Sequence, residues 1–170
     1  RAFSDYVARY ISPKIRIGSP LRLYSELRIA QLFAERSWGD FGYDFSSCNI
    51  ANYRQGNDNT DLRWCGECPK CANSYLLFAP FLAAEELKAI FDGQDLFEKP
   101  NLTNTFKGLL GIDGISKPFE CVGETDELRL AYRLSQSKGG YGVLPFDVPE
   151  SKFDYQKTYP AQEWAVKMIQ

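Results

Sequence analysis

The chain has 170 residues, of which 44% are hydrophobic and 25% are charged, and its net charge is −2. This composition is typical of a globular protein and excludes collagen-like, coiled-coil and disordered chains. The balance of 20 basic and 22 acidic residues provides no basic excess for nucleic acid or a membrane surface. The longest apolar run, residues 75–84, contains Pro80 and is too short to cross a bilayer. We therefore expect a cytoplasmic protein with no nucleic-acid or membrane partner.

The first half of the chain predicts helices and one short strand. Residues 1–11 have the spacing of a helix, and the alternation over residues 14–18 predicts a strand. Ser25 is expected to cap a helix over residues 26–36. A strand, a turn and a helix form half of a β–α–β unit. The predicted fold class is therefore α/β and helix-rich.

The rest of the chain alternates loops with helices. Residues 38–64 are polar and predict a loop, and residues 117–123 look extended. Proline and glycine residues bound the helices in between. The predicted helices are 71–78, 83–91, 102–110, 125–136 and 161–169.

Two features of the composition lead to predictions: the absence of histidine and the position of the single methionine. No histidine is present, so serine–histidine and cysteine–histidine catalysis are excluded within this chain. Acid–base chemistry must fall on Asp, Glu, Cys, Lys or Tyr. The first residue is Arg1 and the single methionine is Met168. We therefore expect a fragment whose functional site has its other half elsewhere.

Four of the five cysteines are spaced as metal ligands are. Cys48 is followed by Cys65, Cys68 and Cys71, with glycine and proline in the turns between the last three. A two-residue gap lets a tight turn direct two thiolates at one ion, and four thiolates make a closed, structural zinc site. Two alternatives stay open at this point: a disulfide pair with free thiols, and an iron–sulfur cluster.

The motifs around these cysteines resemble those of a known superfamily. In chain order, these motifs are a Pro-Leu turn at residues 18–21, a predicted helix, and the Cys-Gly-Glu-Cys-Pro-Lys-Cys block at 65–71. This order is similar to the end of PP-loop ATP pyrophosphatases such as 7-cyano-7-deazaguanine synthase, whose zinc knuckle implies that the four cysteines are zinc ligands. The sixteen-residue gap after Cys48 departs from that pattern. The resemblance implies that residues 1–92 are the last part of a PP-loop α/β domain, which includes the zinc knuckle at 48–71. Residues 93–170 would form a helical extension.

The second half resembles one member of this superfamily more closely. Leu-Leu-Gly at 109–111 and Lys-Pro-Phe-Glu-Cys-Val-Gly-Glu at 117–124 are similar to the UDP-N-acetyl-α-D-muramoyl-L-alanyl-L-glutamate epimerase (MurL) family. That resemblance implies an isomerase of bacterial peptidoglycan synthesis that uses ATP and magnesium. It would convert the terminal L-Glu of a UDP-linked muramoyl dipeptide to D-Glu through an acyl-adenylate. No Ser-Gly-Gly-x-Asp-Ser type of nucleotide loop is present. ATP and magnesium are therefore expected on an N-terminal half, and this chain alone is expected to be inactive.

An epimerase of this kind requires an acid–base residue at the α-carbon. Cys121 and Glu120 are the candidates, and neighbouring side chains of an extended segment face opposite ways. Lys117, Arg129 and Arg133 are candidate substrate contacts. Each has a plainer interpretation: a small buried hydrophobe for Cys121, a solvated lysine, and arginines paired with surface acids. Likewise, Gly-Gly-Tyr-Gly at 139–142 is a phosphate cradle or, more simply, a turn.

Two other classes of function compete with the epimerase. The first is another PP-loop adenylating enzyme, acting on a deazapurine or on tRNA, and the acidic net charge argues mildly against tRNA. The second is a zinc-knuckle module that binds a partner protein, which would need a large exposed apolar patch. The substrate that stimulates AMP formation would distinguish the two enzymes.

Overall fold

The computed structural model describes residues 2–15, 17–53, 63–120 and 122–160. Within these ranges the regular structure is helical, and no strand is present. No helix among them is long and apolar enough to span a membrane. The helix-rich prediction is confirmed, whereas the strand predicted at 14–18 is wrong. Only two apolar residues alternate there, and Ile15 N instead donates to Ser12 O (3.2 Å) in a turn.

The chain divides into two compact units, and the first is the smaller. It comprises residues 1–25 and 156–170. Its helices are α1 (Ala2–Tyr10) and η1 (Pro20–Leu23), so the helix predicted at 1–11 is confirmed. Tyr159 N donates to Leu23 O (2.8 Å) and ties the two parts of the unit together. The helix predicted at 161–169 lies outside the described residues.

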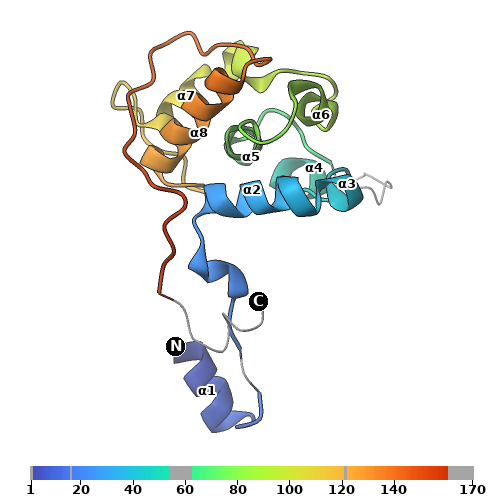
Figure 1. Ribbon diagram of the computed structural model, residues 1–170, viewed down its shortest axis with the longest axis vertical. Coiled ribbons are helices and arrows are strands. Elements are labelled where there is room, and N and C mark those ends of the chain that lie inside the picture. Colours follow the sequence, from blue (N-terminus) through green and yellow to red (C-terminus); the bar gives the residue numbers. More distant parts are fainter. Residues whose placement is uncertain (1, 16, 54–62, 121, 161–170) are drawn as a thin grey trace. The chain divides into compact units, whose positions relative to one another are not determined.

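The second unit spans residues 26–155 and holds most of the buried side chains. The boundary expected at residue 92 falls inside it. Figure 1 shows its helices packed around α5. They are α2 (Glu26–Arg36), α3 (Trp38–Phe41), α4 (Asn49–Tyr53), α5 (Pro69–Phe78), α6 (Ala84–Ala89), η2 (Leu96–Glu98), η3 (Pro100–Leu102), α7 (Thr103–Leu110) and α8 (Thr125–Lys138).

Helix α5 is the centre of this unit, and its buried residues include the polar Asn73 and Ser74. Every residue from 71 to 78 is buried, as expected for a helix without a solvent face. It packs against α2, α7 and α8. Pro69 occupies the first turn and Phe78 is the last residue, two positions before Pro80, as predicted.

Aromatic side chains fill the space around α5. Tyr75 packs edge-on against Phe97, with ring centroids 4.9 Å apart, and also against Phe91. Phe78 contacts Trp38 at the other end of the helix. Such tilted and edge-on pairs are the preferred arrangement of aromatic rings. Phe78 and Phe91 are both buried in this core.

The remaining helix predictions have mixed outcomes. Helix α2 has the predicted bounds, and α7 and α8 lie within two residues of theirs. The region predicted as a loop, residues 38–64, contains α3 and α4. Both helices are at most five residues long, too short for helical periodicity to show.

Candidate metal centre and catalytic segment

Four cysteines from three stretches of chain meet at the start of α5. Cys48 lies just before α4, and Cys65 lies in the loop that leads into α5. Cys68 is the N-cap of α5, and Cys71 is in its first turn. Their sulfur atoms all lie within 4.8 Å of one another. All four are free thiols. Spacing in the sequence therefore identified the group that the fold assembles.

The distances between the sulfur atoms match those around a tetrahedral ion. Cys48 and Cys68 are 3.8 Å apart, Cys65 and Cys71 are 3.7 Å apart, and Cys68 and Cys71 are 3.5 Å apart, each measured between Sγ atoms. An ion with four thiolates at about 2.3 Å requires sulfur atoms about 3.8 Å apart. These three distances are close to those of a four-thiolate site, and no other pair of these sulfur atoms is more than 4.8 Å apart.

Backbone amides around the cluster are arranged for thiolates. Ala51 N donates to Cys48 Sγ and Glu67 N donates to Cys65 Sγ, both at 3.4 Å. The turn between Cys65 and Cys68 contains Gly66 at φ +65°, a conformation that favours glycine. Donors directed at sulfur stabilise its negative charge and orient metal-bound ligands.

The thiols also perturb one another. Hydrogen bonds from Cys71 first, and from the other thiols, lower the pKa of Cys68 to about 5. The same contact, together with burial, raises the pKa of Cys71. Burial is the main reason why the pKa of Cys65 rises to about 11. Binding of a divalent cation would require the thiols that hold it to lose their protons.

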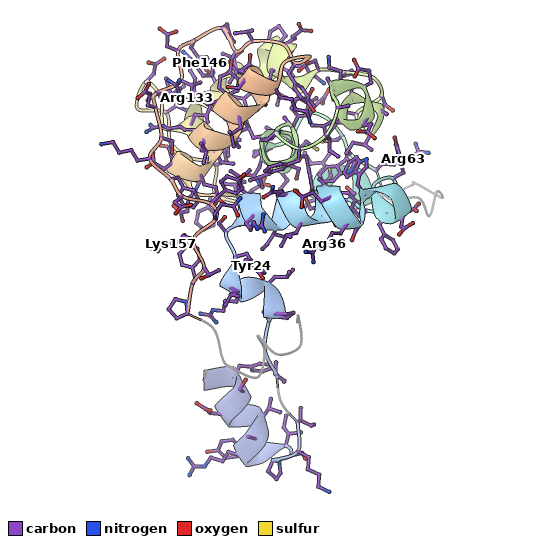
Figure 2. All side chains as sticks on the ribbon, in the orientation of Figure 1. Tyr24, Arg36, Arg63, Arg133, Phe146 and Lys157 are labelled. Atoms are coloured by element: carbon purple, nitrogen blue, oxygen red, sulfur yellow. The ribbon has the colours of Figure 1, made fainter. Side chains whose placement is uncertain are left out.

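The polar run between the first two cysteines is closed at its base. Ser46 Oγ donates to Arg63 O (2.6 Å), and Arg63 N donates to Asn52 Oδ1 (3.1 Å). Asn52 Nδ2 in turn donates to Cys48 O (2.7 Å). Figure 2 labels Arg63 where the described chain resumes. Residues 54–62 of this run lie outside the described ranges.

The segment after α7 carries the predicted acid–base residues. Lys117 and Glu120 are exposed, and so is Phe119 between them. Cys121 lies outside the described residues. The segment ends at Gly123, whose N–H donates to Asn73 Oδ1 of α5 (2.9 Å). Residues 117–120 form a loop without strand partners.

Acidic residues surround the end of this segment. Glu127 is 3% exposed, and its Oε1 accepts from Leu27 N (2.7 Å) at the start of α2. Burial first, and then the charges of Glu127 and Glu124, raise the pKa of Glu26, while Lys117 opposes this shift. Glu26 and Glu127 were not predicted as site residues from the sequence. Their only sequence signal was a place in the first turn of a helix, where acids are common on exposed surfaces.

The two predicted arginines are bound to carbonyl groups of the chain. Arg129 donates to Leu110 O (2.8 Å) and Gly111 O (3.1 Å). Arg133 donates to Val148 O (2.8 Å). It also lines a shallow groove with Phe146, and Figure 2 labels both residues. The two guanidinium groups therefore donate to different segments of the chain.

The Gly-Gly-Tyr-Gly stretch at 139–142 is a turn that ends α8. Gly139 and Gly140 both have positive φ. Gly142 N donates to Asp95 Oδ2 (2.8 Å), a carboxylate of this chain. Of the two interpretations left open above, the structure favours the turn.

The chain is similar to a known protein family. The family model described as "MurL C-terminal domain" matches residues 44–142, a range that contains the cysteine cluster and the segment after α7. No solved structure shows significant similarity to the chain.

Three curated relatives carry the same printed name, UDP-N-acetyl-alpha-D-muramoyl-L-alanyl-L-glutamate epimerase. The protein of Xanthomonas oryzae pv. oryzae is 39% identical over 138 residues, which is 81% of this chain and 30% of the relative. That of Salinispora tropica is 41% identical over 129 residues (75% and 26%). That of a Micromonospora species is 42% identical over 119 residues (68% and 24%).

The three alignments cover most of this chain but only a small part of each relative. The chain spans less than a third of the length of these relatives. The chain belongs to the family of MurL C-terminal domains.

Proposed function

We propose that this chain contributes the C-terminal part of an isomerase that converts the terminal L-Glu of UDP-MurNAc-L-Ala-L-Glu to D-Glu in peptidoglycan synthesis. The similarity to three proteins named as this epimerase carries the proposal. Nothing in these relatives' names favours a deazapurine or tRNA enzyme, or a protein-binding module. The PP-loop fold remains part of the proposal, with its sheet supplied by sequence outside the described residues.

The chemistry requires activation of the substrate carboxylate before proton transfer. The α-proton beside a free carboxylate is held tightly, because its removal would create a dianionic enolate. Attack of the carboxylate on ATP forms an acyl-adenylate and releases pyrophosphate, which removes that charge. One group then takes the α-proton, another returns a proton to the opposite face, and water releases AMP. We place ATP and magnesium on sequence outside this chain, which lacks a Ser-Gly-Gly-x-Asp-Ser loop.

Within this chain, Glu120 and Cys121 remain our candidates for the base, and Lys117 for a substrate contact. The exposure of Lys117 and Glu120 supports this role, because both can reach a ligand. Arg129 and Arg133 are weaker candidates because their donors are engaged with carbonyl groups.

The activity can be tested with a chimera in which this chain replaces the matching region of the Xanthomonas oryzae relative. We expect the chimera to release AMP only with the dipeptide substrate, and to incorporate deuterium at the α-carbon from heavy water. In Cys121→Ser or Glu120→Gln, loss of the base should slow deuterium uptake by about 10²–10⁴-fold while AMP release persists.

Two controls belong to this experiment. The 170-residue chain alone should release no AMP, and activity of the chain alone would contradict the proposed division of roles. If both variants exchange the proton at the normal rate, the base lies elsewhere in the chimera.

We further propose that Cys48, Cys65, Cys68 and Cys71 hold one structural zinc ion. The tetrahedral sulfur distances and the absence of histidine support this assignment. Four thiolates leave no open position, so the ion would stabilise the fold and take no part in catalysis.

Elemental analysis of the purified chain should find about one zinc per molecule. A strong chelator should remove it and unfold the region from Cys48 to Phe78, because metal binding and folding are coupled. Cys68→Ser should lose the metal, whereas Cys121→Ser, at the fifth cysteine, should keep it. Iron and sulfide in stoichiometric amounts, or disulfides among the four, would show the assignment to be wrong.

A further inference from the structure

The segment between α7 and α8 is attached to the core at both ends, while its middle is exposed. Ser116 lies at its start and Gly123 at its end. Between them, Phe119 is completely exposed and Glu120 is also exposed. A phenylalanine in this position contributes nothing to the core. The attachment points therefore decide where this part of the segment is presented.

The end of the segment is held by a buried amide. Asn73 of α5 is 6% exposed, and its Oδ1 accepts from Gly123 N at 2.9 Å. Gly123 has no room to move toward its other neighbours. A Cβ atom on it would lie 3.1 Å from Leu128 Cδ2 and 3.2 Å from Glu26 Oε2. A backbone N–H buried without an acceptor is costly, so Asn73 fixes this end.

The start of the segment is held by close backbone packing. Gly108 of α7 is buried, and a Cβ atom on it would lie 2.7 Å from Ser116 O. It would also lie 3.3 Å from Pro118 Cδ. Only glycine allows α7 and the segment to approach so closely.

One of these attachments leads to the cysteine cluster. Cys68 and Cys71 begin α5, and Asn73 follows Cys71 by two residues in the same helix. The thiols that define the start of α5 therefore also define the position of the acceptor for Gly123. A rigid helix of this kind is a suitable support for a reactive group.

We propose that Asn73 is a positioning residue, which holds the segment ending at Gly123 in the place needed for α-proton transfer and links that place to the cysteine cluster. The proposal rests on the proposed function, since it assigns the segment a part in that reaction. Displacement of a reacting group by about 1 Å can slow a reaction about 10²-fold.

The hydrogen bond is tested on the 170-residue chain loaded with zinc. In Asn73→Leu, which removes the acceptor, amide hydrogen exchange at Gly123 should become at least ten times faster. Asn73→Asp keeps an acceptor oxygen and should keep most of the protection. Ser135→Ala is the control, because it removes a buried hydroxyl of α8 that bonds to Tyr132 O in its own helix. If Gly123 is unprotected, or if Asn73→Leu leaves its exchange unchanged, the inference is wrong whatever the protein catalyses.

The role is tested in the chimera described above. Asn73→Leu should lower kcat for α-deuterium uptake by about 10- to 100-fold, with KM within twofold and AMP release unchanged. Asn73→Asp should restore most of that loss. A merely structural residue would lower both steps together, and that result would overturn the role.

The other end of the segment provides an independent variant. Gly108→Ala should displace Ser116 and slow deuterium uptake without altering the Asn73 acceptor. An unchanged rate in this variant and in Asn73→Leu would refute positioning by the segment. If the unaltered chimera releases AMP but never exchanges the α-proton, the proposed function fails together with this role, and the Gly123 measurement still decides whether the hydrogen bond exists.

Discussion

Asp95 is a buried carboxylate that joins three separate stretches of the core. Its Oδ1 accepts from Phe97 N (3.0 Å), and its Oδ2 accepts from Gly142 N (2.8 Å). Lys88 Nζ lies 3.0 Å from Oδ2, and the Asp95 side chain is only 4% exposed. The phenol of Tyr75 is close by, and burial together with the charge of Asp95 raises its pKa. A single side chain therefore fixes the turn after α8 to the segment before η2.

Replacement of this carboxylate should be strongly destabilising. In Asp95→Ala, the buried amide of Phe97 and the partly buried amide of Gly142 lose their acceptor, and Lys88 loses its ion-pair partner. Removal of one partner of a buried pair typically costs about 3–5 kcal/mol. Urea unfolding of the zinc-loaded chain would measure the change in free energy of unfolding. Asp147→Ala, at an exposed position, should stay within about 0.5 kcal/mol; equal effects at the two positions would contradict this account of Asp95.

The individual residues of the site differ in how visible they were in the sequence. The four cysteines were predicted to form a cluster from spacing alone, because the ligand geometry of a metal restricts spacing. Asn73 and Glu127 carried no such signal. An asparagine within a helix and a glutamate in a first turn are ordinary surface residues until the partners, Gly123 and Leu27, are known.

The end of α7 and its junction with α8 depend on the backbone conformation of one residue, Gly111. Gly111 has φ +62° and ψ 49°, the left-handed conformation common after helices. Its carbonyl accepts from Arg129 Nη2 at 3.1 Å. A Cβ atom here would lie 3.0 Å from Thr125 Cγ2. The junction of α7 with α8 is thus both strained for other residues and crowded.

Gly111→Ala should therefore lower stability by about 1–2 kcal/mol from the left-handed backbone alone. Gly39→Ala is the matched control, because Gly39 lies in α3, its φ is not positive, and a Cβ atom there would meet nothing within 4 Å. That control should be neutral or stabilise the chain by up to about 1 kcal/mol. Thermal unfolding of both variants would test the difference, and an opposite order would contradict the assigned role of Gly111.

Among the elements, the long helices were predicted well and the short ones were not. Helix α2 runs over eleven residues, enough for an apolar face to repeat. Helices α3 and α4 have four and five residues, and tertiary packing of Trp38 and the cysteine cluster holds them in place. The strand predicted at 14–18 did not form, because the alternation of two isoleucines provides no partner for backbone hydrogen bonds.

At the scale of the whole molecule, the sequence indicated helix content but not which helices meet. The bond from Leu27 N to Glu127 joins α2 to α8 across 100 residues. Periodicity identifies the apolar face of each helix, and it does not identify that face's partner. The central place of α5 was not foreseeable from its sequence, because Asn73 and Ser74 interrupt its apolar residues and are nevertheless buried.

The hydrogen bonds that close the base of the polar run between Cys48 and Cys65 bear on how long this run can be. Arg63 bonds to Asn52 and to Ser46, so the chain on the two sides of residues 54–62 is held together close to Cys48 and Cys65. An insertion between Asn52 and Arg63 should therefore leave the ligand geometry unchanged, because doubling the length of a connection between two fixed points costs only about 0.6 kcal/mol. The unusually long gap is therefore nearly neutral for folding. The same position is a permissive site for a fluorescent label or an affinity tag in living cells.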